Sequence, residues 1–411
     1  MLRRNALPLV FASTLHAQST PPSLEVFSQL TSNSPKVFNP ALSELERNWK
    51  NSYAVMLLEM LTLLAADNPA RDRLLRFLEL RTGQTFGLKL HDWHRWLWSL
   101  PYDPHPHYAM FKGILYANFD PRMQTFFPLD RQTQSRVRLD QVEWGGVRVN
   151  GIPPLVNPKH IPAAEAGYLK DNHTVFGLSL GNQSRAYPKR ILAWHEMARD
   201  TVDGQNICLV YCTLCGTVIP YLAQSKGGTH TFGTSGLLYE SSKLMFDEET
   251  NSLWSTLQGQ PVIGPLANSG LQLDFVNVVT TTWGEWRALH PDTTALSLDT
   301  GHRRDYGEGA AYRAYFASDD LMFQVSRKDT RLRRKDEILA IRLPQRQPLA
   351  IAMAYLLKHP QFTTSHDGAT VEVQTTRGGA TTVKVDGKPF PAHRAFWFAW
   401  YTQFPSTALI R

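Results

Sequence analysis

Apolar side chains recur at steps of three and four residues through positions 41–100, which is the spacing of one helix face. A first helix is predicted over 41–66. A second begins after Asn68 and Pro69, which suit a helix start, and stops at Gly83. A third, shorter helix is predicted over 92–100. The short connections between them indicate a small helical module over 41–100.

The pattern changes on both sides of this module. Residues 18–40 are rich in Ser, Thr and Pro and predict an extended leader or linker, and 101–153 predicts a connecting segment. From 154 to 411 the hydrophobic pattern predicts a β-rich domain, because short β-type runs are bounded by Gly, Asn and Pro. The expected strands and hairpin are Val147–Val149, Thr174–Leu180, Ile207–Tyr211, Thr229–Phe232, Pro261–Ile263, and the pair 370–374 and 381–385.

One clear helix, over 191–200, interrupts these strands. The domain lacks the regular alternation of strand and helix that a doubly wound parallel sheet requires. The predicted fold class is therefore α+β, with a helical N-terminal module followed by a β-rich, mostly antiparallel domain.

Residues 1–17 have the pattern of a signal peptide. Arg3 and Arg4 precede a short apolar run, and Leu15-His16-Ala17 is a small-residue cleavage site before Gln18. The run is too short to cross a bilayer, which needs about 20 apolar residues, and no other segment approaches that length. These features predict an exported protein of the periplasm or cell envelope, without a transmembrane segment.

Composition and charge narrow the function classes. The 43% hydrophobic and 19% charged residues are typical of a globular protein. The formal net charge is +7, and removal of 1–17 takes away two arginines and leaves +5. The densest basic run, at 327–335, has no accompanying recognition motif with interleaved aromatic residues, so we expect no nucleic-acid partner.

The three cysteines of this 411-residue chain all lie within eight positions. Cys212 and Cys215 form a C-x2-C pair followed by Gly216, which permits a tight turn, and Cys208 lies four residues upstream. Two thiolates at this spacing can hold one soft metal ion, or they can cycle between dithiol and disulfide.

Three interpretations of the pair stay open. In a metal site, His195, Met245 or His230 would add to the two thiolates; such a set suits copper first and zinc as second choice. In a thiol–disulfide enzyme the same two sulfurs would exchange electrons with a substrate. In a non-catalytic envelope protein that binds a ligand or acts as a scaffold, the pair would be a local disulfide or two buried thiols.

Two further stretches are candidate pocket elements. His230 to Tyr239 contains Gly233, Ser235 and Gly236 in a glycine-rich turn whose backbone N–H groups can line a pocket. The spacing differs from G-x-S-x-G, which argues against a serine hydrolase. Asp247, further along, is predicted to cap a turn. Asp299, Arg303 and Asp305 predict a buried Asp–Arg network beside the pocket.

Together these strings resemble the bacterial family known as domain of unknown function 3179. The matching motifs are Arg185–Pro188, Trp194–Glu196, Tyr211–Thr217, Phe232–Tyr239, Leu253–Ser255, Gly264–Leu266, Asp299–Tyr306 and a C-terminal signature at Phe396–Tyr401. The similarity runs from about Pro154 to the end of the chain. It implies an exported, often envelope-associated protein, and it implies no particular activity. Many members resemble lipoproteins, whereas no cysteine follows the signal here, which argues against a lipid anchor.

The sequence thus predicts a pocket built by the helix of His195, the cysteine turn and the glycine-rich turn. Its ligand would be a metal ion or an unknown small molecule. A periplasmic copper protein is the first hypothesis and a thiol–disulfide oxidoreductase the second.

Overall fold

The computed structural model describes residues 20–127 and 135–411. The chain divides into a helical unit, residues 20–90 with 103–106, and a β-rich unit, residues 91–102 with 107–411. Each unit is described by itself. The predicted signal peptide lies outside the described residues.

The helical unit holds short helices around the apolar helix α3, in which every residue from Ala54 to Leu61 is buried. Its elements are α1 (Leu24–Gln29), α2 (Pro35–Arg47), the 3-10 turn η1 (Asn51–Tyr53), α3 (Ala54–Leu63) and α4 (Ala70–Thr82). The predicted ends of α4 are confirmed. The Asn68 side chain accepts the N–H of Ala70 at 2.9 Å, and Gly83 ends the helix at a φ of 71°.

Two expectations for this region are wrong. Residues 18–40 were expected to be extended, but α1 and the first part of α2 lie there. The single helix expected over 41–66 is divided between α2 and α3, because Asn48 leaves helical geometry and Lys50 is extended. The apolar spacing continues across this break, so periodicity alone does not reveal it.

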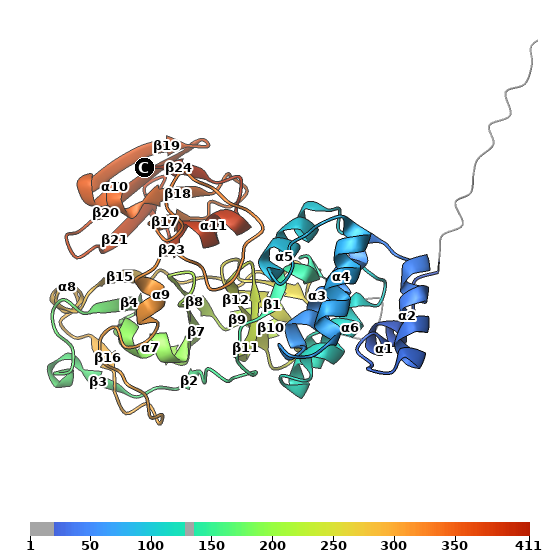
Figure 1. Ribbon diagram of the computed structural model, residues 1–411. Helices are drawn as coiled ribbons and strands as arrows, with labels where there is room; N and C mark the ends of the chain where they lie inside the picture. The colour runs from blue at the N-terminus through green and yellow to red at the C-terminus, as the bar shows by residue number, and fades with distance from the viewer. Residues whose placement is uncertain (1–19, 128–134) are drawn as a thin grey trace, which may run out of the picture. The chain divides into compact units, whose positions relative to one another are not determined.

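The β-rich unit contains most of the chain, and its elements are labelled in Figure 1. Its helices are α5 (Leu90–Ser99), α6 (Tyr108–Tyr116), η2 (Pro121–Phe126), η3 (Leu139–Gln141), η4 (Ala163–Glu165), α7 (Lys189–His195), α8 (Trp283–Leu289), α9 (Arg313–Phe316), α10 (Met353–Lys358) and α11 (Trp397–Gln403). Its strands up to the middle of the unit are β1 (Val142–Trp144), β2 (Leu155–Val156), β3 (His160–Pro162), β4 (Thr174–Leu180), β5 (Gln183–Pro188), β6 (Met197–Val202), β7 (Gln205–Cys212), β8 (Thr217–Leu222), β9 (Gln224–Ser225), β10 (Gly228–Thr229), β11 (Phe232–Tyr239) and β12 (Ser242–Asp247). The others are β13 (Leu253–Ser255), β14 (Gln260–Ile263), β15 (Val279–Thr282), β16 (Thr294–Leu296), β17 (Glu337–Ile341), β18 (Leu349–Ala352), β19 (Gln361–His366), β20 (Ala369–Thr375), β21 (Thr381–Val385), β22 (Lys388–Pro389), β23 (His393–Phe396) and β24 (Ala408–Ile410).

These strands form several small sheets. Their strand orders are β1-β11-β12-β13-β14, β15-β4-β5-β16-β3, β2-β6-β7-β8, β23-β17-β18-β24, β19-β20-β21-β22 and β10-β9. Neighbouring strands are antiparallel except for β2 with β6, β16 with β5 and β18 with β24. The α+β class, with helices first and a β-rich part after them, is therefore confirmed in its broad form. None of the helices within 20–127 and 135–411 is both long and apolar enough to cross a membrane.

Strand β7 lies between two apolar cores. Because successive side chains of a strand point to opposite faces, Cys208, Val210 and Cys212 enter one core while Leu209 and Tyr211 enter the other. Paired to β6 and β8 on its two edges, β7 is buried on both faces. The cysteine pair therefore starts from one of the most enclosed strands of the unit.

Other local predictions have mixed outcomes. The strand over Thr174–Leu180 is β4, and the C-terminal hairpin is β20 with β21. The segment at Val147–Val149, expected as a strand, forms turns. The helix expected over 191–200 is wrong in its second half: α7 ends at His195, Glu196 has a φ of 55°, and β6 follows because that segment pairs with β7.

The C-terminal sheets share a core of their own. Leu339 and Ile351 of one sheet belong to the same buried cluster as Val371 and Val383 of the other. In Figure 1 these sheets are the orange and red part of the chain. Cys215 connects with this part, because its carbonyl accepts the N–H of Phe396 at 2.7 Å.

Candidate functional site

The cysteine pair lies at the end of β7. Cys212 is the last residue of the strand, a turn follows, and the two sulfurs are joined in a disulfide with the Cα atoms 5.3 Å apart. The carbonyl of Cys212 accepts the N–H of Cys215 at 3.1 Å, which closes the turn. Cys208 is a free, buried thiol. The C-x2-C spacing thus brings the two sulfurs together as the sequence predicts.

Gly216 makes this turn possible. Its φ is 59°, and a Cβ added to it would lie 2.7 Å from the Phe396 ring. We expect Gly216→Ala to lower the free energy of unfolding by about 1–3 kcal/mol, because it combines left-handed strain with overpacking. Urea unfolding followed by circular dichroism measures this. Gly204→Ala is the matched control for the strain, since that glycine also has a positive φ but has open space around it; a loss as large there would contradict the packing argument.

A small cavity of about 50 Å³ borders one cysteine of the pair. Its lining residues are Gly145, Val147, Ile152, Glu196, Cys212, Thr213, Leu214, Thr234, Gly236, Leu237, Leu238, Lys243 and Tyr312. Cys212 is among them and Cys215, which is fully buried, is not. The two cysteines of the disulfide therefore differ in their surroundings, because Cys212 borders the cavity and Cys215 does not.

A buried ion pair faces the same cavity. The Lys243 ammonium donates to Glu196 Oε2 at 3.1 Å, and the two side chains are 6% and 9% exposed. Glu196 Oε1 accepts two further hydrogen bonds, from the Thr213 hydroxyl at 2.8 Å and the Tyr312 hydroxyl at 2.9 Å. The carboxylate is thus held by three donors, which is what a buried charge requires.

Two residues of this cavity have unusual backbone conformations. Glu196 and Tyr312 both have a φ of 55°, a region that large L-residues rarely adopt. Each costs of the order of 1 kcal/mol or more, and such residues cluster at functional sites. The hydrogen bond between them ties the two strained positions together across the cavity.

The surroundings of the two thiol groups on this face of β7 differ. The backbone N–H of Lys243 donates to Cys212 Sγ at 3.5 Å, a contact that favours the thiolate of Cys212 once the disulfide is reduced. Burial raises the pKa of Cys208 to about 12, so that thiol stays protonated. Burial lowers the pKa of Lys243, and the charge of Glu196 opposes this change.

A wider hollow adjoins the cavity. It has a volume of about 360 Å³ and shares Val147, Ile152 and Tyr312 with the cavity, while Trp194 and Arg304 line its outer part.

The predicted metal ligands are divided between two places. Met245 is fully buried in the apolar cluster that also holds Cys212 and Cys215. The His195 imidazole is engaged elsewhere: Nδ1 donates to the Pro153 carbonyl at 2.9 Å, and Nε2 therefore accepts from the Tyr306 hydroxyl at 2.5 Å. Across the described part of the chain, the cysteines and His195 are not among the groups of three ligand atoms close enough to share a metal ion.

The glycine-rich stretch was expected to be a turn, but it lies within strand β11, because it pairs with β12; it contributes to the cavity through its middle. Gly236 lines the cavity and Thr234, two residues earlier, does so too. Ser235 is buried and donates to the Leu244 carbonyl at 2.7 Å, which is a structural role. Gly233 leaves room for Phe246 and the Asn150 side chain. His230 and Tyr239, at either end of the stretch, do not line the cavity.

The charged segment near residue 300 differs from its prediction. Asp299, Arg303 and Asp305 are exposed, so the expected buried network is wrong. Charged residues close in sequence can be satisfied by water as well as by one another. The segment's contact with the interior is made by Tyr306, which reaches His195.

Sequence reasoning missed the polar residues that surround Cys212. Glu196, Lys243 and Tyr312 converge from α7, β12 and the loop before α9. The available signal was an ionisable residue inside an apolar strand: Lys243 precedes Leu244-Met245-Phe246. Such a residue needs a buried partner of opposite charge, but the sequence does not say which one.

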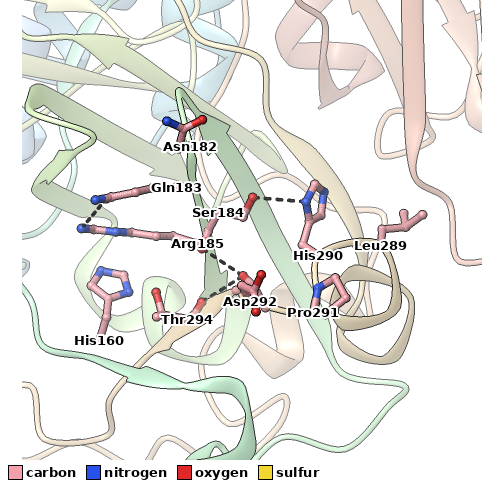
Figure 2. A pocket seen from close by; sticks show the side chains of 11 residues that line it. His160, Asn182, Gln183, Ser184, Arg185, Leu289, His290, Pro291, Asp292 and Thr294 are labelled. Carbon is pink, nitrogen blue, oxygen red and sulfur yellow. Dashed lines mark hydrogen bonds between the residues drawn. The ribbon is translucent and has the colours of Figure 1, made fainter.

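A separate polar hollow of about 490 Å³ lies over β5 and the start of β16. Figure 2 shows its lining, in which the Ser184 hydroxyl and His290 Nδ1 are 3.2 Å apart. Beneath it Asp200 binds Arg185 at 2.6 Å and His160 at 2.8 Å. Arg185, the arginine of this lining, is thus already neutralised by Asp200.

The chain belongs to the family described as "Protein of unknown function (DUF3179)", whose sequence profile matches residues 149–389, more than half of the chain. The resemblance inferred from the motifs is therefore confirmed. The match begins slightly before the expected start at Pro154 and ends at Pro389, so the stretch Phe396–Tyr401 lies beyond it. No curated protein and no solved structure matches the chain.

Proposed function

We propose that this protein is an exported thiol–disulfide oxidoreductase in which Cys212 and Cys215 exchange electrons with a thiol substrate. The observation that supports the proposal is the asymmetry of the pair. Cys212 alone faces the cavity, together with the Glu196–Lys243 ion pair, while Cys215 lies behind it. In disulfide exchange one sulfur is attacked and the other is released, so a cavity that borders only one cysteine favours attack at that one.

The reaction proceeds in two exchanges. A substrate thiolate attacks Cys212 Sγ, the bond to Cys215 breaks, and Cys215 leaves as a thiolate that takes up a proton. The second thiolate of the same substrate then attacks the substrate sulfur of the mixed disulfide, and Cys212 leaves. Two electrons pass from a substrate dithiol to the protein disulfide, and the two protons lost by the dithiol are taken up by the protein thiols. The small cavity admits only the tip of such a substrate.

The N–H of Lys243 assists the reverse direction. It donates to Cys212 Sγ and so stabilises the thiolate form of the residue that would attack a substrate disulfide. The Lys243 ammonium adds positive charge on the same side, although Glu196 neutralises most of it. Cys212 is therefore the nucleophile and Cys215 the resolving cysteine in this proposal.

A trapping experiment tests the proposal. Cys215→Ser removes the resolving thiol, so we expect a mixed disulfide to accumulate on Cys212 in a periplasmic extract. Non-reducing electrophoresis and mass spectrometry detect this mixed disulfide, and dithiothreitol should release it. In the unmodified protein we expect a reversible two-electron titration at a potential above about −300 mV, the upper range of structural disulfides.

The third cysteine provides the control. Cys208→Ser leaves the pair intact and should trap nothing, and Cys212→Ser removes the attacking sulfur and should trap nothing either. If the disulfide is reduced only after unfolding, or if Cys215→Ser traps no more than Cys212→Ser, the pair is structural and the proposal fails.

A second candidate is a carrier of copper(I). One observation favours it: in the reduced state two thiolates and the thioether of Met245 would lie in one buried cluster, a soft ligand set for copper, with zinc as second choice. His195 would join it only by leaving its two hydrogen bonds. We expect about one copper ion per reduced chain by elemental analysis under this hypothesis. Copper content unchanged by Cys212→Ser together with Cys215→Ser would exclude it.

A further inference from the structure

Three potential metal ligands meet at the other end of the β11–β12 hairpin. One ligand atom each of His230, Asp247 and Glu249 lies within 4.8 Å of the other two. His230 is 6% exposed and Asp247 is fully buried, whereas Glu249 is exposed. Hydrogen bonds from Glu248 N to the Thr231 carbonyl at 2.9 Å hold the two segments side by side.

The His230 imidazole carries an unsatisfied nitrogen. Its Nε2 is 2.8 Å from the Ser225 hydroxyl, while Nδ1 is buried and has no hydrogen-bond partner within the described chain. A buried polar atom without a partner costs about 1–3 kcal/mol. An Nε2–H donated to Ser225 Oγ leaves a lone pair on Nδ1, which is the form of histidine that binds metal.

The carboxylates also have unused capacity. Asp247 is fully buried, yet its bonds come from the neutral donors Thr250 and Trp254. Both oxygens of Glu249 accept the same N–H, that of Thr231, at 2.9 and 3.0 Å. No ion pair of the described residues involves either carboxylate, so this end of the hairpin holds negative charge without a partner of opposite charge.

We propose that His230, Asp247 and Glu249 bind one divalent transition-metal ion of the zinc or manganese type. One imidazole and two carboxylates suit such ions better than the soft copper(I). Two ligands of one ion are at most about 4.4 Å apart, since metal–ligand bonds are about 2.0–2.2 Å long. The exposed Glu249 side chain can move by the remaining fraction of an ångström, and water would occupy the open positions.

The surroundings fit such a site. The Trp254 ring lies 5.0 Å from the His230 ring, and its Nε1–H donates to Asp247 Oδ2 at 2.7 Å. This hydrogen bond fixes the orientation of the Asp247 carboxylate, as residues around the ligands of a metal site commonly do. Asp247 also confirms the predicted turn cap, since its Oδ1 accepts the N–H of Thr250 at 2.7 Å.

Calorimetric titration with Zn²⁺ and with Mn²⁺ tests the proposal. The protein is the full chain carrying Cys212→Ser and Cys215→Ser, so that the C-x2-C pair contributes nothing; Cys208 remains as a buried thiol. We expect one bound ion per chain. On this background Glu249→Gln should weaken binding at least about tenfold, and His230→Gln should remove it. Glu249 is exposed, so its variant should fold even if the His230 variant does not.

Glu248→Gln is the matched control. Glu248 lies next to Glu249 but pairs with Arg199 at 3.0 Å, so we expect unchanged metal affinity. Two results would overturn the proposal. One is metal binding that Glu249→Gln leaves unaltered. The other is no binding of either ion up to a concentration of about 1 mM, which corresponds to weak affinity. Because the Cys212–Cys215 pair is absent, either result leaves the oxidoreductase proposal untouched.

Discussion

Lys243→Met is expected to lower the free energy of unfolding by about 3–5 kcal/mol, because it leaves the Glu196 carboxylate buried without its cation. The pair is enclosed, with side-chain exposures of 6% and 9%, so solvent screens it little. The Thr213 and Tyr312 hydroxyls remain but carry no charge. Urea unfolding of the Cys208→Ser protein, which avoids thiol side reactions, measures the loss.

The double variant separates charge burial from packing. Lys243→Met with Glu196→Gln removes both charges, and we expect it to recover a large part of the loss, since a neutral pair needs no compensation. Lys159→Met is the exposed counterpart: Lys159 and Asp299 are 3.7 Å apart but 63% and 76% exposed, so the change should stay within about 0.5 kcal/mol. Equal losses at Lys243 and Lys159 would contradict the argument.

Asp200→Asn is expected to lower the free energy of unfolding by a similar amount, about 3–5 kcal/mol. The Asp200 side chain is 5% exposed and accepts from Arg185 at 2.6 Å, Tyr187 at 2.7 Å and His160 at 2.8 Å. The neutral amide leaves the Arg185 guanidinium without its counter-charge. Asp171→Asn is the control, because Asp171 is 76% exposed in its pair with Arg287.

The same carboxylate predicts a pH dependence. Burial alone would raise the pKa of Asp200, but hydrogen bonds from His160, Arg185 and Tyr187 outweigh it and bring the pKa from 3.8 to about 2. Because the folded pKa lies below the unfolded one, the contribution is complete above about pH 4 and is lost as the pH falls toward 2. It amounts to about 2 kcal/mol. Unfolding at pH 5, 4 and 3 should show this loss in the unmodified protein and not in Asp200→Asn.

Local signals in the sequence predicted local structure well. Gly83 ends α4 because only a residue free of Cβ strain adopts its backbone angles easily, and this property is visible in the sequence. The C-x2-C spacing likewise closes its turn within four residues. By contrast, 191–200 has a helical pattern throughout, and only pairing with β7, a contact between distant segments, makes β6 a strand.

In the candidate site, too, local features could be predicted from the sequence and contacts between distant residues could not. The sequence brought the α7 end, the cysteine turn and the glycine-rich stretch to one pocket, and the cavity is lined by residues from all three. It did not predict that Glu196 and Lys243, 47 positions apart, pair with each other. The spacing of hydrophobic residues determines which side of a strand is buried, but the partner of a buried charge depends on how sheets meet.

The burial of Cys208 determines how many cysteines a thiol-labelling reagent would modify in the folded protein. It lies on the same face of β7 as Cys212 and is equally buried, at 1% exposed, but burial raises the pKa of its thiol to about 12, so the thiol stays protonated. An alkylating agent should therefore find no reactive group on the oxidised native chain, and at most two after reduction. A third label would appear only in unfolded molecules, so Cys208 reports on unfolding while the other two report on oxidation state.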